Sequence, residues 1–287
     1  MIYLVLSILI SSGLYVIFKL FEKFKINTFQ AIVVNYIVAF TIGYLYSPIK
    51  IPVTEISKQP WFFGAVALGL LFISIFNLMG LTAQKNGLSV ASVSGRMAVV
   101  IPIIFGVILY NEKITFIKVT GIILALLAVY LTSVKKEKLN INKSSLLFPA
   151  ILFLGSGAID TLLKYAEVNF VPSSQVSIFS ASIFGIAFIL GLITVIIQGI
   201  RGRITLNFRN IVGGIVLGIP NYFSIEFLIR ALKIEGFDSA ILFTINNVCI
   251  VLLTTISGLI LFNEKLEKRN WIGIAIAVLS IVLITIK

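Results

Sequence analysis

The chain is a succession of apolar runs, each long enough to cross a membrane. A membrane-spanning helix needs about 20 consecutive apolar residues, and runs of this length follow one another along nearly all of the 287 residues. Hydrophobic residues make up 59% of the sequence and charged residues only 12%, whereas about 25% of the residues in an ordinary soluble domain are charged. The mean hydropathy is +1.10. The sequence therefore predicts an all-α integral membrane protein.

Ten apolar runs are present, and the connectors between them are short. The longest connectors, 48–60, 135–144 and 199–209, are too short to hold a soluble domain. The first run has no basic segment before it and no small-residue cleavage site, so we interpret it as a retained span. The predicted membrane spans, numbered 1 to 10, are 2–21, 29–47, 61–83, 88–110, 115–134, 145–165, 174–198, 210–232, 237–262 and 270–286.

Several function classes are excluded by the residue types that are missing. The sequence has no His, a single Cys249, and two Asp residues, Asp160 and Asp238. Without His, imidazole-based zinc sites and catalysis by Ser-His-Asp or Cys-His groups cannot be built, and two Asp residues cannot form paired Asp-rich magnesium motifs. A phosphate-binding loop ending in Lys-Ser or Lys-Thr is also missing, which argues against ATP hydrolysis. We therefore expect no enzyme activity, no metal and no cofactor, with energy taken from a gradient or a partner.

The net charge of +12 comes mostly from Lys and Arg in the connectors. In a soluble chain this charge would suggest nucleic-acid binding, but here the basic residues flank apolar runs, where they orient helices in the membrane. Alternate connectors, starting with the one between spans 1 and 2, carry fourteen Lys and Arg residues, and the opposite side carries seven. The positive-inside rule alone thus predicts that both chain termini lie outside, and we expect no nucleic-acid partner.

An internal repeat relates the two halves of the chain. Segment 109–113, Leu-Tyr-Asn-Glu-Lys, recurs 152 residues later as Leu-Phe-Asn-Glu-Lys at 261–265, and at the same offset Gly121 matches Gly273. We predict two five-helix repeats that meet between residues 138 and 139, one over 1–138 and one over 139–287. Because five is odd, the second repeat inserts upside down. Inverted repeats are common in secondary transporters, since exchanging the conformations of the two halves moves a central site between the membrane faces.

The chain has five plus five spans, and each half ends with an Asn-Glu-Lys turn and a last helix that contains Gly. This arrangement resembles the EamA-like branch of the drug/metabolite transporter superfamily. The motif residues are 111–113 with Gly121, and 263–265 with Gly273. The resemblance covers the whole chain. It implies a membrane transporter of small metabolites with a central cavity lined by spans 1, 3, 4, 6, 8 and 9. It also implies cytoplasmic termini, opposite to the charge count, so both orientations stay open.

Arg96 is the clearest candidate for a functional residue. It lies deep in span 4, where a charge costs about 2.5 to 3.5 kcal/mol on insertion scales and therefore requires a partner, an aqueous cavity or a function. Helical spacing places Ser92 and Arg96 on one stripe. At the repeat offset, Asn246 and Asn247 in span 9 place polar groups at matching depth. We predict a central binding site around Arg96, with a purely structural Arg as the alternative.

Acidic residues in spans 6 and 8 are candidates for proton coupling or for pairing with Arg96. Asp160 lies one helical turn before Lys164, and Glu226 one turn before Arg230, so each pair can neutralise itself. By the resemblance, Asp160 and Glu226 lie on cavity-lining helices. The candidate substrate-binding or coupling residues are Arg96, Ser92, Asn77, Asp160, Glu226, Asn246 and Asn247.

Other polar and helix-breaking residues have more local roles. Asn77 in span 3 supplies an amide, a group that also joins helices in membranes. Pro102 and Pro220 lie inside spans 4 and 8, where a proline frees a backbone carbonyl and permits a kink. Glu112 and Glu264, at the repeated turns, are expected to cap the helices that follow them.

The leading hypothesis is a secondary active transporter, an exporter or exchanger, for a small polar or amphipathic metabolite in the cytoplasmic membrane. The planar guanidinium of Arg96 suits a carboxylate or a phosphate. If Asp160 or Glu226 instead fixes Arg96, a neutral or cationic substrate is equally acceptable. An intramembrane enzyme and a non-transporting membrane scaffold are the alternatives. The expected partners are a small-molecule substrate, protons and the lipid bilayer, and the expected assembly is a monomer or a homodimer.

Overall fold

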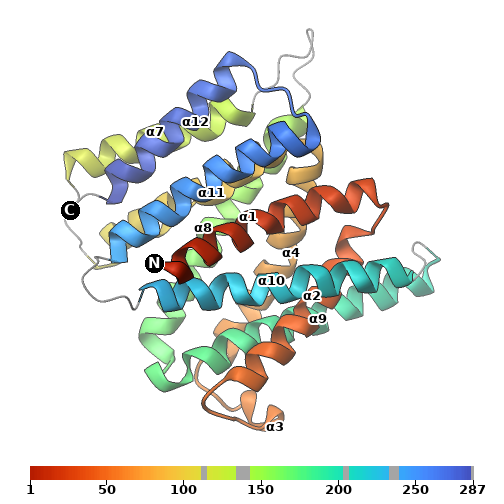
Figure 1. Ribbon diagram of the computed structural model, residues 1–287. Helices are drawn as coiled ribbons and strands as arrows, with labels where there is room; N and C mark the ends of the chain where they lie inside the picture. The colour runs from red at the N-terminus through yellow and green to blue at the C-terminus, as the bar shows by residue number, and fades with distance from the viewer. Residues whose placement is uncertain (111–114, 134–142, 203–206, 233–238, 286–287) are drawn as a thin grey trace. The chain divides into compact units, whose positions relative to one another are not determined.

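The computed structural model is helical throughout the part of the chain that it describes, residues 1–110, 115–133, 143–202, 207–232 and 239–285 (Figure 1). Its α-helices are α1 (Ile2–Lys23), α2 (Thr28–Tyr46), α3 (Val53–Ile56), α4 (Phe62–Lys85), α5 (Leu88–Met97), α6 (Val100–Tyr110), α7 (Phe116–Ser133), α8 (Lys143–Phe170), α9 (Val176–Ile200), α10 (Phe208–Leu232), α11 (Ser239–Phe262) and α12 (Lys268–Thr285), and η1 (Ser173–Gln175) is a 3-10 turn.

Within these residues, eight segments are long and apolar enough to cross a membrane, and α7 contains a shorter apolar helix. Each predicted span coincides with helical structure to within a few residues. The prediction of a multi-pass all-α membrane protein is thereby confirmed. The predicted boundary between the repeats, at residues 138 and 139, lies outside the described residues.

Span 4 is the exception to the prediction of continuous helices. The sequence predicted one helix over 88–110, but the chain forms α5 and α6, separated by a turn at residues 98–99. Pro102 explains the break, because it has no N–H to donate to the carbonyl of Ala98. That carbonyl instead accepts the N–H of Ile101 at 2.9 Å, one residue earlier. Pro220, by contrast, lies inside α10 without interrupting it.

The chain divides into two units, and the boundaries between them fall inside α1, α4, α8 and α10. Unit 1 consists of Met1–Leu20, Leu78–Ala158 and Phe223–Lys287, and unit 2 of Phe21–Asn77 and Ile159–Tyr222. Each unit has its own apolar core. In unit 1 the core lies among α5, α7, α11 and α12, and in unit 2 it surrounds the fully buried Trp61 at the start of α4.

In unit 1 the last helices of the two repeats, α7 and α12, lie side by side (Figure 1). Gly121 of α7 packs against Leu283 and Ile284 of α12, while Gly273 of α12 packs against Leu131 and Thr132 of α7. The offset of 152 residues converts each of these contacts into the other. Two helices that exchange contacts in this way run antiparallel about a local twofold axis, as an inverted repeat requires.

A second repeat-related pair, α2 and α9, packs in the same manner in unit 2. Gly43 of α2 contacts Ala181 of α9, and Gly191 of α9 contacts Val33 of α2. An offset of 148 residues exchanges these two contacts. Both pairs therefore place equivalent helices of the two repeats antiparallel and in close contact, which small residues permit in membrane helices.

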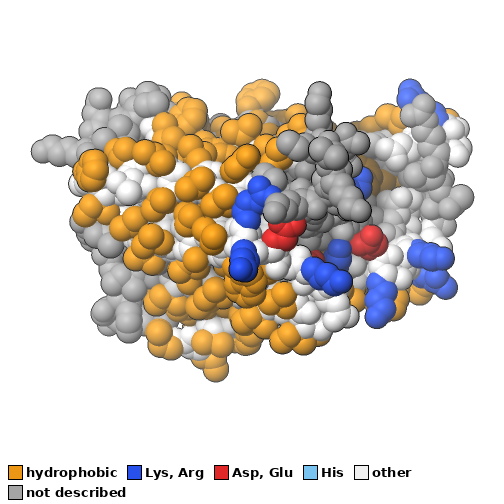
Figure 2. Space-filling model, turned by 90° about the horizontal axis from the view of Figure 1, so that it is seen from above, with side chains coloured by type: hydrophobic (Ala, Val, Ile, Leu, Met, Phe, Trp, Pro, Cys, Tyr) orange, Lys and Arg blue, Asp and Glu red, His pale blue; other side chains and the backbone are white. Residues whose placement is uncertain are grey.

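Large apolar side chains also cover much of the outer surface. The most exposed are Phe63, Phe116 and Ile200, with 82%, 85% and 82% of their area accessible. On the face shown in Figure 2, hydrophobic side chains fill broad areas, and the charged side chains are concentrated in one part of it. A soluble monomer rarely exposes apolar patches of this extent, whereas a lipid-facing surface consists of them.

Candidate functional site

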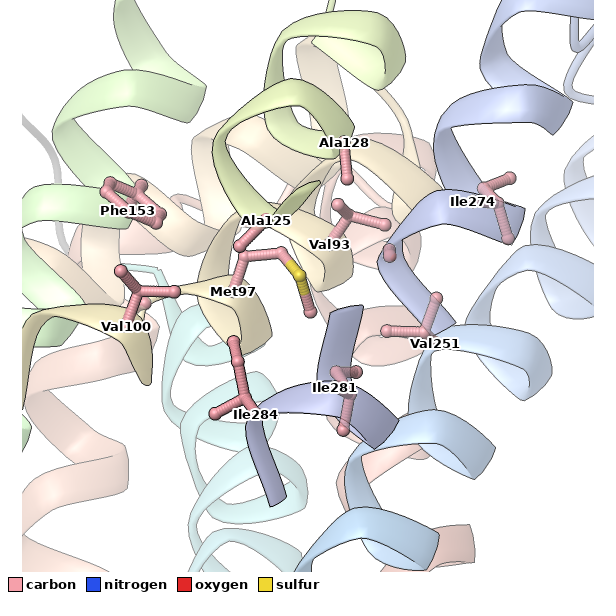
Figure 3. Close-up of a cluster of buried hydrophobic side chains, with 12 residues drawn as sticks. Val93, Met97, Val100, Ala125, Ala128, Phe153, Val251, Ile274, Ile281 and Ile284 are labelled. Atoms are coloured by element: carbon pink, nitrogen blue, oxygen red, sulfur yellow. The ribbon is translucent and has the colours of Figure 1, made fainter. Parts of the chain in front are cut away.

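The position of Arg96 follows from the two faces of α5. Val93 and Met97 are fully buried, and together with Val100 of α6 they face α7 and α12, as Figure 3 shows. Ser92 and Arg96 are offset from this apolar stripe by about one residue, or 100° of helical rotation. The packing of the apolar face thus turns Ser92 and Arg96 toward α11.

α5 and α11, the repeat-related helices of spans 4 and 9, run antiparallel. The hydroxyl oxygens of Ser92 and Thr254 lie 2.7 Å apart. One turn further along α5, Arg96 Nη1 donates to Asn247 Oδ1 at 3.2 Å. Since the contact moves backward along α11 as it moves forward along α5, the helices point in opposite directions. At the repeat offset Asn247 corresponds to Gly95, so this hydrogen bond lies close to the local twofold axis.

Arg96 is hydrogen-bonded to Asn247 through Nη1 and keeps its Nε donor unused. The Tyr15 hydroxyl of α1 faces its guanidinium, next to Gly95. The Nε atom is buried and has no hydrogen-bond partner. Among the described residues of unit 1, Arg96 forms no ion pair. Within unit 1, the groups that contact the positively charged guanidinium are therefore neutral.

Helices α1 and α10 extend this polar region. Ser7 Oγ donates to the carbonyl of Ser224 at 3.0 Å and lies 3.4 Å from Asn246 Oδ1. We call the whole group the polar layer; it consists of Ser7 and Tyr15 of α1, Ser92 and Arg96 of α5, Ser224 of α10, and Asn246, Asn247 and Thr254 of α11. Ser7, Tyr15, Ser224 and Thr254 were not predicted, although the spacing of Ser7 and Tyr15 at two helical turns is a detectable signal.

Several hydroxyls near the polar layer are also unsatisfied. Within the described chain, Ser12, Ser89 and Ser94 each bury a hydroxyl oxygen that has no hydrogen-bond partner. Buried polar atoms usually have a partner, because leaving one without a hydrogen bond costs free energy. These serines and Arg96 all belong to unit 1. Their unused donors and acceptors suit a region that takes up a polar molecule.

Glu226 is not the partner of Arg96. Its carboxylate accepts a hydrogen bond from Arg230 Nε at 2.8 Å, so the predicted pair one helical turn apart is confirmed, and an ion pair between Arg96 and Glu226 is not formed. The guanidinium of Arg230 also lies over the ring of Tyr3.

The other predicted site residues lie in unit 2. Asn77 is half-buried near the end of the α4 segment in that unit, and Asp160 is exposed on α8. The polar layer, as defined above, consists of residues of unit 1. In the part of the chain that is described, no group of three or more His, Cys, Asp or Glu side chains is arranged to hold a metal ion.

Glu264 caps a helix, but not the helix that follows it. Both of its carboxylate oxygens accept the N–H of Leu88, at 2.9 and 3.2 Å, so it caps the start of α5 instead of α12. Gly87, with a positive φ of 108°, precedes that N–H, and a Cβ on either Gly87 or Gly258 would lie within about 3 Å of the carboxylate. Glu112, its repeat counterpart, lies outside the described residues.

The fold and these contacts define a class of protein before any comparison is made. The described part of the chain is helical, with eight candidate spans and antiparallel pairs of repeat-related helices. This is the architecture of a multi-pass membrane protein built from inverted repeats. Residues 1–134 match the EamA-like transporter family, which confirms the resemblance inferred from the sequence. An uncharacterized protein of Haemophilus influenzae is 28% identical over 287 residues, covering 97% of this chain and 95% of that protein.

Proposed function

We propose that the chain is a secondary active transporter that moves a small polar or amphipathic metabolite across the cytoplasmic membrane by alternating access. The substrate binds at the polar layer, with Arg96 as its main contact. The observation that carries this proposal is the half-buried guanidinium of Arg96, which is hydrogen-bonded to Asn247 and retains an unsatisfied Nε atom.

The state of Arg96 favours a substrate with an anionic group. A charge placed inside a membrane protein needs a compensating partner, and Glu226 does not supply one because it is bound to Arg230. A guanidinium presents its N–H groups as a planar fork that matches a carboxylate or a phosphate. An anion at Arg96 would neutralise the charge and satisfy the free Nε. Tyr15 and Asn247 would then orient the guanidinium.

Two features of the fold support alternating access. The repeat-related helices α5 and α11 cross near Arg96, so equivalent elements of both repeats flank the site, as rocking of one repeat against the other requires. The break before Pro102 separates α5 from α6, and such breaks let a span bend without losing its remaining hydrogen bonds. Exchange of one metabolite for another would need no proton carrier in the polar layer, in which no described residue is a carboxylate.

A ligand-stability screen on the detergent-purified protein tests the proposal. The panel contains small carboxylates, phosphate esters, and neutral and cationic amphiphiles, and the readout is the melting temperature. We expect an anionic compound to raise the melting temperature of the parent protein and of an Arg230→Lys control, but not that of Arg96→Lys. Transport of that compound is then measured in proteoliposomes. If Arg96→Ala transports it at the parental rate, the polar layer is not the substrate site.

A further inference from the structure

Ser92 of α5 and Thr254 of α11, which we call the hydroxyl pair, join the two repeat-related helices on one side of Arg96. Both residues are fully buried, and their hydroxyl oxygens lie 2.7 Å apart, the usual distance of an O–H···O hydrogen bond. Ser92 precedes Arg96 by four residues, about 6 Å along α5. α5 begins and α11 ends at connectors of the side that carries fourteen Lys and Arg residues, here called the cation-rich side. The hydroxyl pair therefore joins α5 to α11 between Arg96 and that side.

Each hydroxyl of the pair also lies within reach of a carbonyl in its own helix. Ser92 Oγ is 3.1 Å from the carbonyl oxygen of Ser89, and Thr254 Oγ1 is 2.7 Å from that of Ile250. A hydroxyl has one hydrogen to donate, so in the pair one residue donates to the other. If the helices moved apart, both hydroxyls could donate to their own backbone. Separation at this level therefore breaks one interhelical hydrogen bond and leaves neither hydroxyl without an acceptor.

The repeat-related counterpart of the hydroxyl pair cannot form. At the offset of 152 residues, Ser92 corresponds to Thr244 and Thr254 to Pro102. The side chain of proline is a hydrocarbon ring with neither a donor nor an acceptor. The pair and its counterpart positions lie on opposite sides of the local twofold axis that relates α5 to α11. One side of the crossing thus has a side-chain hydrogen bond that the sequence denies to the counterpart positions.

This asymmetry has a consequence for alternating access. In a transporter built from inverted repeats, the two access states arise when the repeats exchange their conformations. The exchange would bring α5 and α11 together at positions 102 and 244 and move them apart at Ser92 and Thr254. The hydrogen bond of the hydroxyl pair would then be broken, and Pro102 could not replace it. The pair therefore favours the state in which α5 and α11 meet toward the cation-rich side.

We propose that the hydroxyl pair is a one-sided gate, which keeps the path between α5 and α11 closed toward the cation-rich side when no substrate is bound. The gate separates when the site opens to that side. This inference rests on the proposed transport function. An average hydrogen bond between membrane helices changes the ratio of two states about threefold. Substrate binding can overcome a bias of this size, because the required difference in affinity between the two states is also small.

Alkylation of a buried cysteine on the cation-rich side of the pair tests the gate. Ser89 lies one helical turn before Ser92, is 2% exposed, and has a hydroxyl without a hydrogen-bond partner. Ser89→Cys with Cys249→Ser therefore gives a protein with one thiol and removes no side-chain hydrogen bond at position 89. The readout is the rate of reaction with N-ethylmaleimide in detergent without substrate, which follows the open fraction. Added to this background, Thr254→Val should raise the rate about threefold.

Thr255→Val is the matched control. Thr255 is buried beside Thr254, and its hydroxyl donates to the carbonyl of Val251 at 2.7 Å within α11. The substitution removes the same hydroxyl from the same helix but leaves the hydroxyl pair intact, so the rate should stay at the background value. Ser92→Ala should act like Thr254→Val, and the double variant should react no faster than either, because both changes break one hydrogen bond.

The proposal is wrong if Thr254→Val leaves the alkylation rate unchanged, or if Thr255→Val raises it as much. Rates that add in the double variant would also contradict it, because the two hydroxyls would then act separately. The assay contains no substrate, so these outcomes are independent of the ligand screen. An unchanged alkylation rate together with an anion that requires Arg96 would reject the gate and keep the proposed function.

Discussion

The helix pairs α7–α12 and α5–α11 have the same origin and differ in what they bury. In α7–α12 the contacts are equivalent. Gly121 packs against Ile284 as Gly273 packs against Thr132, and the 152-residue offset converts one contact into the other. The interface is mostly apolar. In α5–α11 the repeat offset pairs Arg96 with Val248 and Ser94 with Asn246, so the two helices contribute different chemistry.

The comparison indicates where the protein keeps symmetry and where it has lost it. A close-packed pair joined through glycines constrains both partners equally, because either backbone can approach only if the other side is small. A site for an asymmetric substrate has no such requirement. Unpartnered polar atoms accordingly lie near α5 and α11, where Arg96, Ser89 and Ser94 each bury one. We infer that α7–α12 is scaffold and that α5–α11 carries function.

The largest effect is expected from breaking the symmetric pair. In Gly273→Val the new Cβ would lie 3.0 Å from the backbone nitrogen of Thr132, and in Gly121→Val 3.1 Å from that of Ile284. The backbones must separate, at a cost of about 1–3 kcal/mol for each substitution. Because the contacts are equivalent, the two variants should lose equal stability, measured as the melting temperature in detergent. Gly199→Val, at a glycine with open space around it, is the control.

Unequal losses would contradict the symmetric interpretation of α7–α12. If one variant loses more than twice as much free energy of unfolding as the other, only one of the two glycines is at a true close contact. Equal losses with intact folding of Gly199→Val would confirm it.

The second effect should appear in transport and leave stability unchanged. Arg96→Lys keeps the charge but loses the planar fork of donors, so substrate binding should weaken about tenfold, which equals roughly 1.4 kcal/mol. The melting temperature without ligand should stay near the parental value, because Arg96 forms no ion pair within the described part of unit 1. A large fall in stability with normal transport would instead make Arg96 a structural residue.

The sequence predicts the fold better than the site, for a physical reason. Span positions depend on runs of about 20 apolar residues, a signal that any one segment carries alone, and the helices agree with it. The kink in span 4 was likewise readable from Pro102. The hydrogen bond between Arg96 and Asn247 was not itself predicted. The 152-residue offset did predict that the two residues lie at matching depth in spans 4 and 9.

Contacts to backbone atoms could not be predicted in this way. Glu264 binds the N–H of Leu88, 176 residues earlier, and Ser7 donates to the carbonyl of Ser224. Every residue except proline has a backbone N–H, and every residue has a backbone carbonyl. The N–H of Leu88 and the carbonyl of Ser224 therefore have no sequence signature. The prediction that Glu264 caps the following helix was wrong because sequence proximity was its only basis.

The third prediction concerns this distant cap, which joins the end of α11 to the start of α5. Glu264→Gln keeps an oxygen that can accept the N–H of Leu88 but removes the negative charge at the N-terminus of the helix. The expected loss is about 0.3–1 kcal/mol, observed as a lower melting temperature that falls further at low salt concentration relative to the parent. Glu267→Gln, a neighbouring carboxylate that does not contact Leu88, is the control and should behave like the parent. A similar loss in both variants would mean that the charge acts on the connector in general and not on α5.

The smallest effect tests a polar departure from symmetry in α7–α12, the hydrogen bond donated by Ser280. Ser280 is fully buried and donates to the carbonyl of Gly121 at 2.8 Å, and its repeat counterpart is the buried Ala128. Ser280→Ala makes the pair more symmetric and should cost about 0.6 kcal/mol, the average for a hydrogen bond between membrane helices. Ala128→Ser creates the reciprocal donor opposite Gly273 and should recover part of that loss in the double variant. Both changes should leave transport at the parental rate, because α7 and α12 contribute no residue to the proposed substrate site. A transport defect in Ser280→Ala with an unchanged melting temperature would show that α7–α12 also takes part in the transport cycle, and the division between scaffold and functional pair would then have to be abandoned.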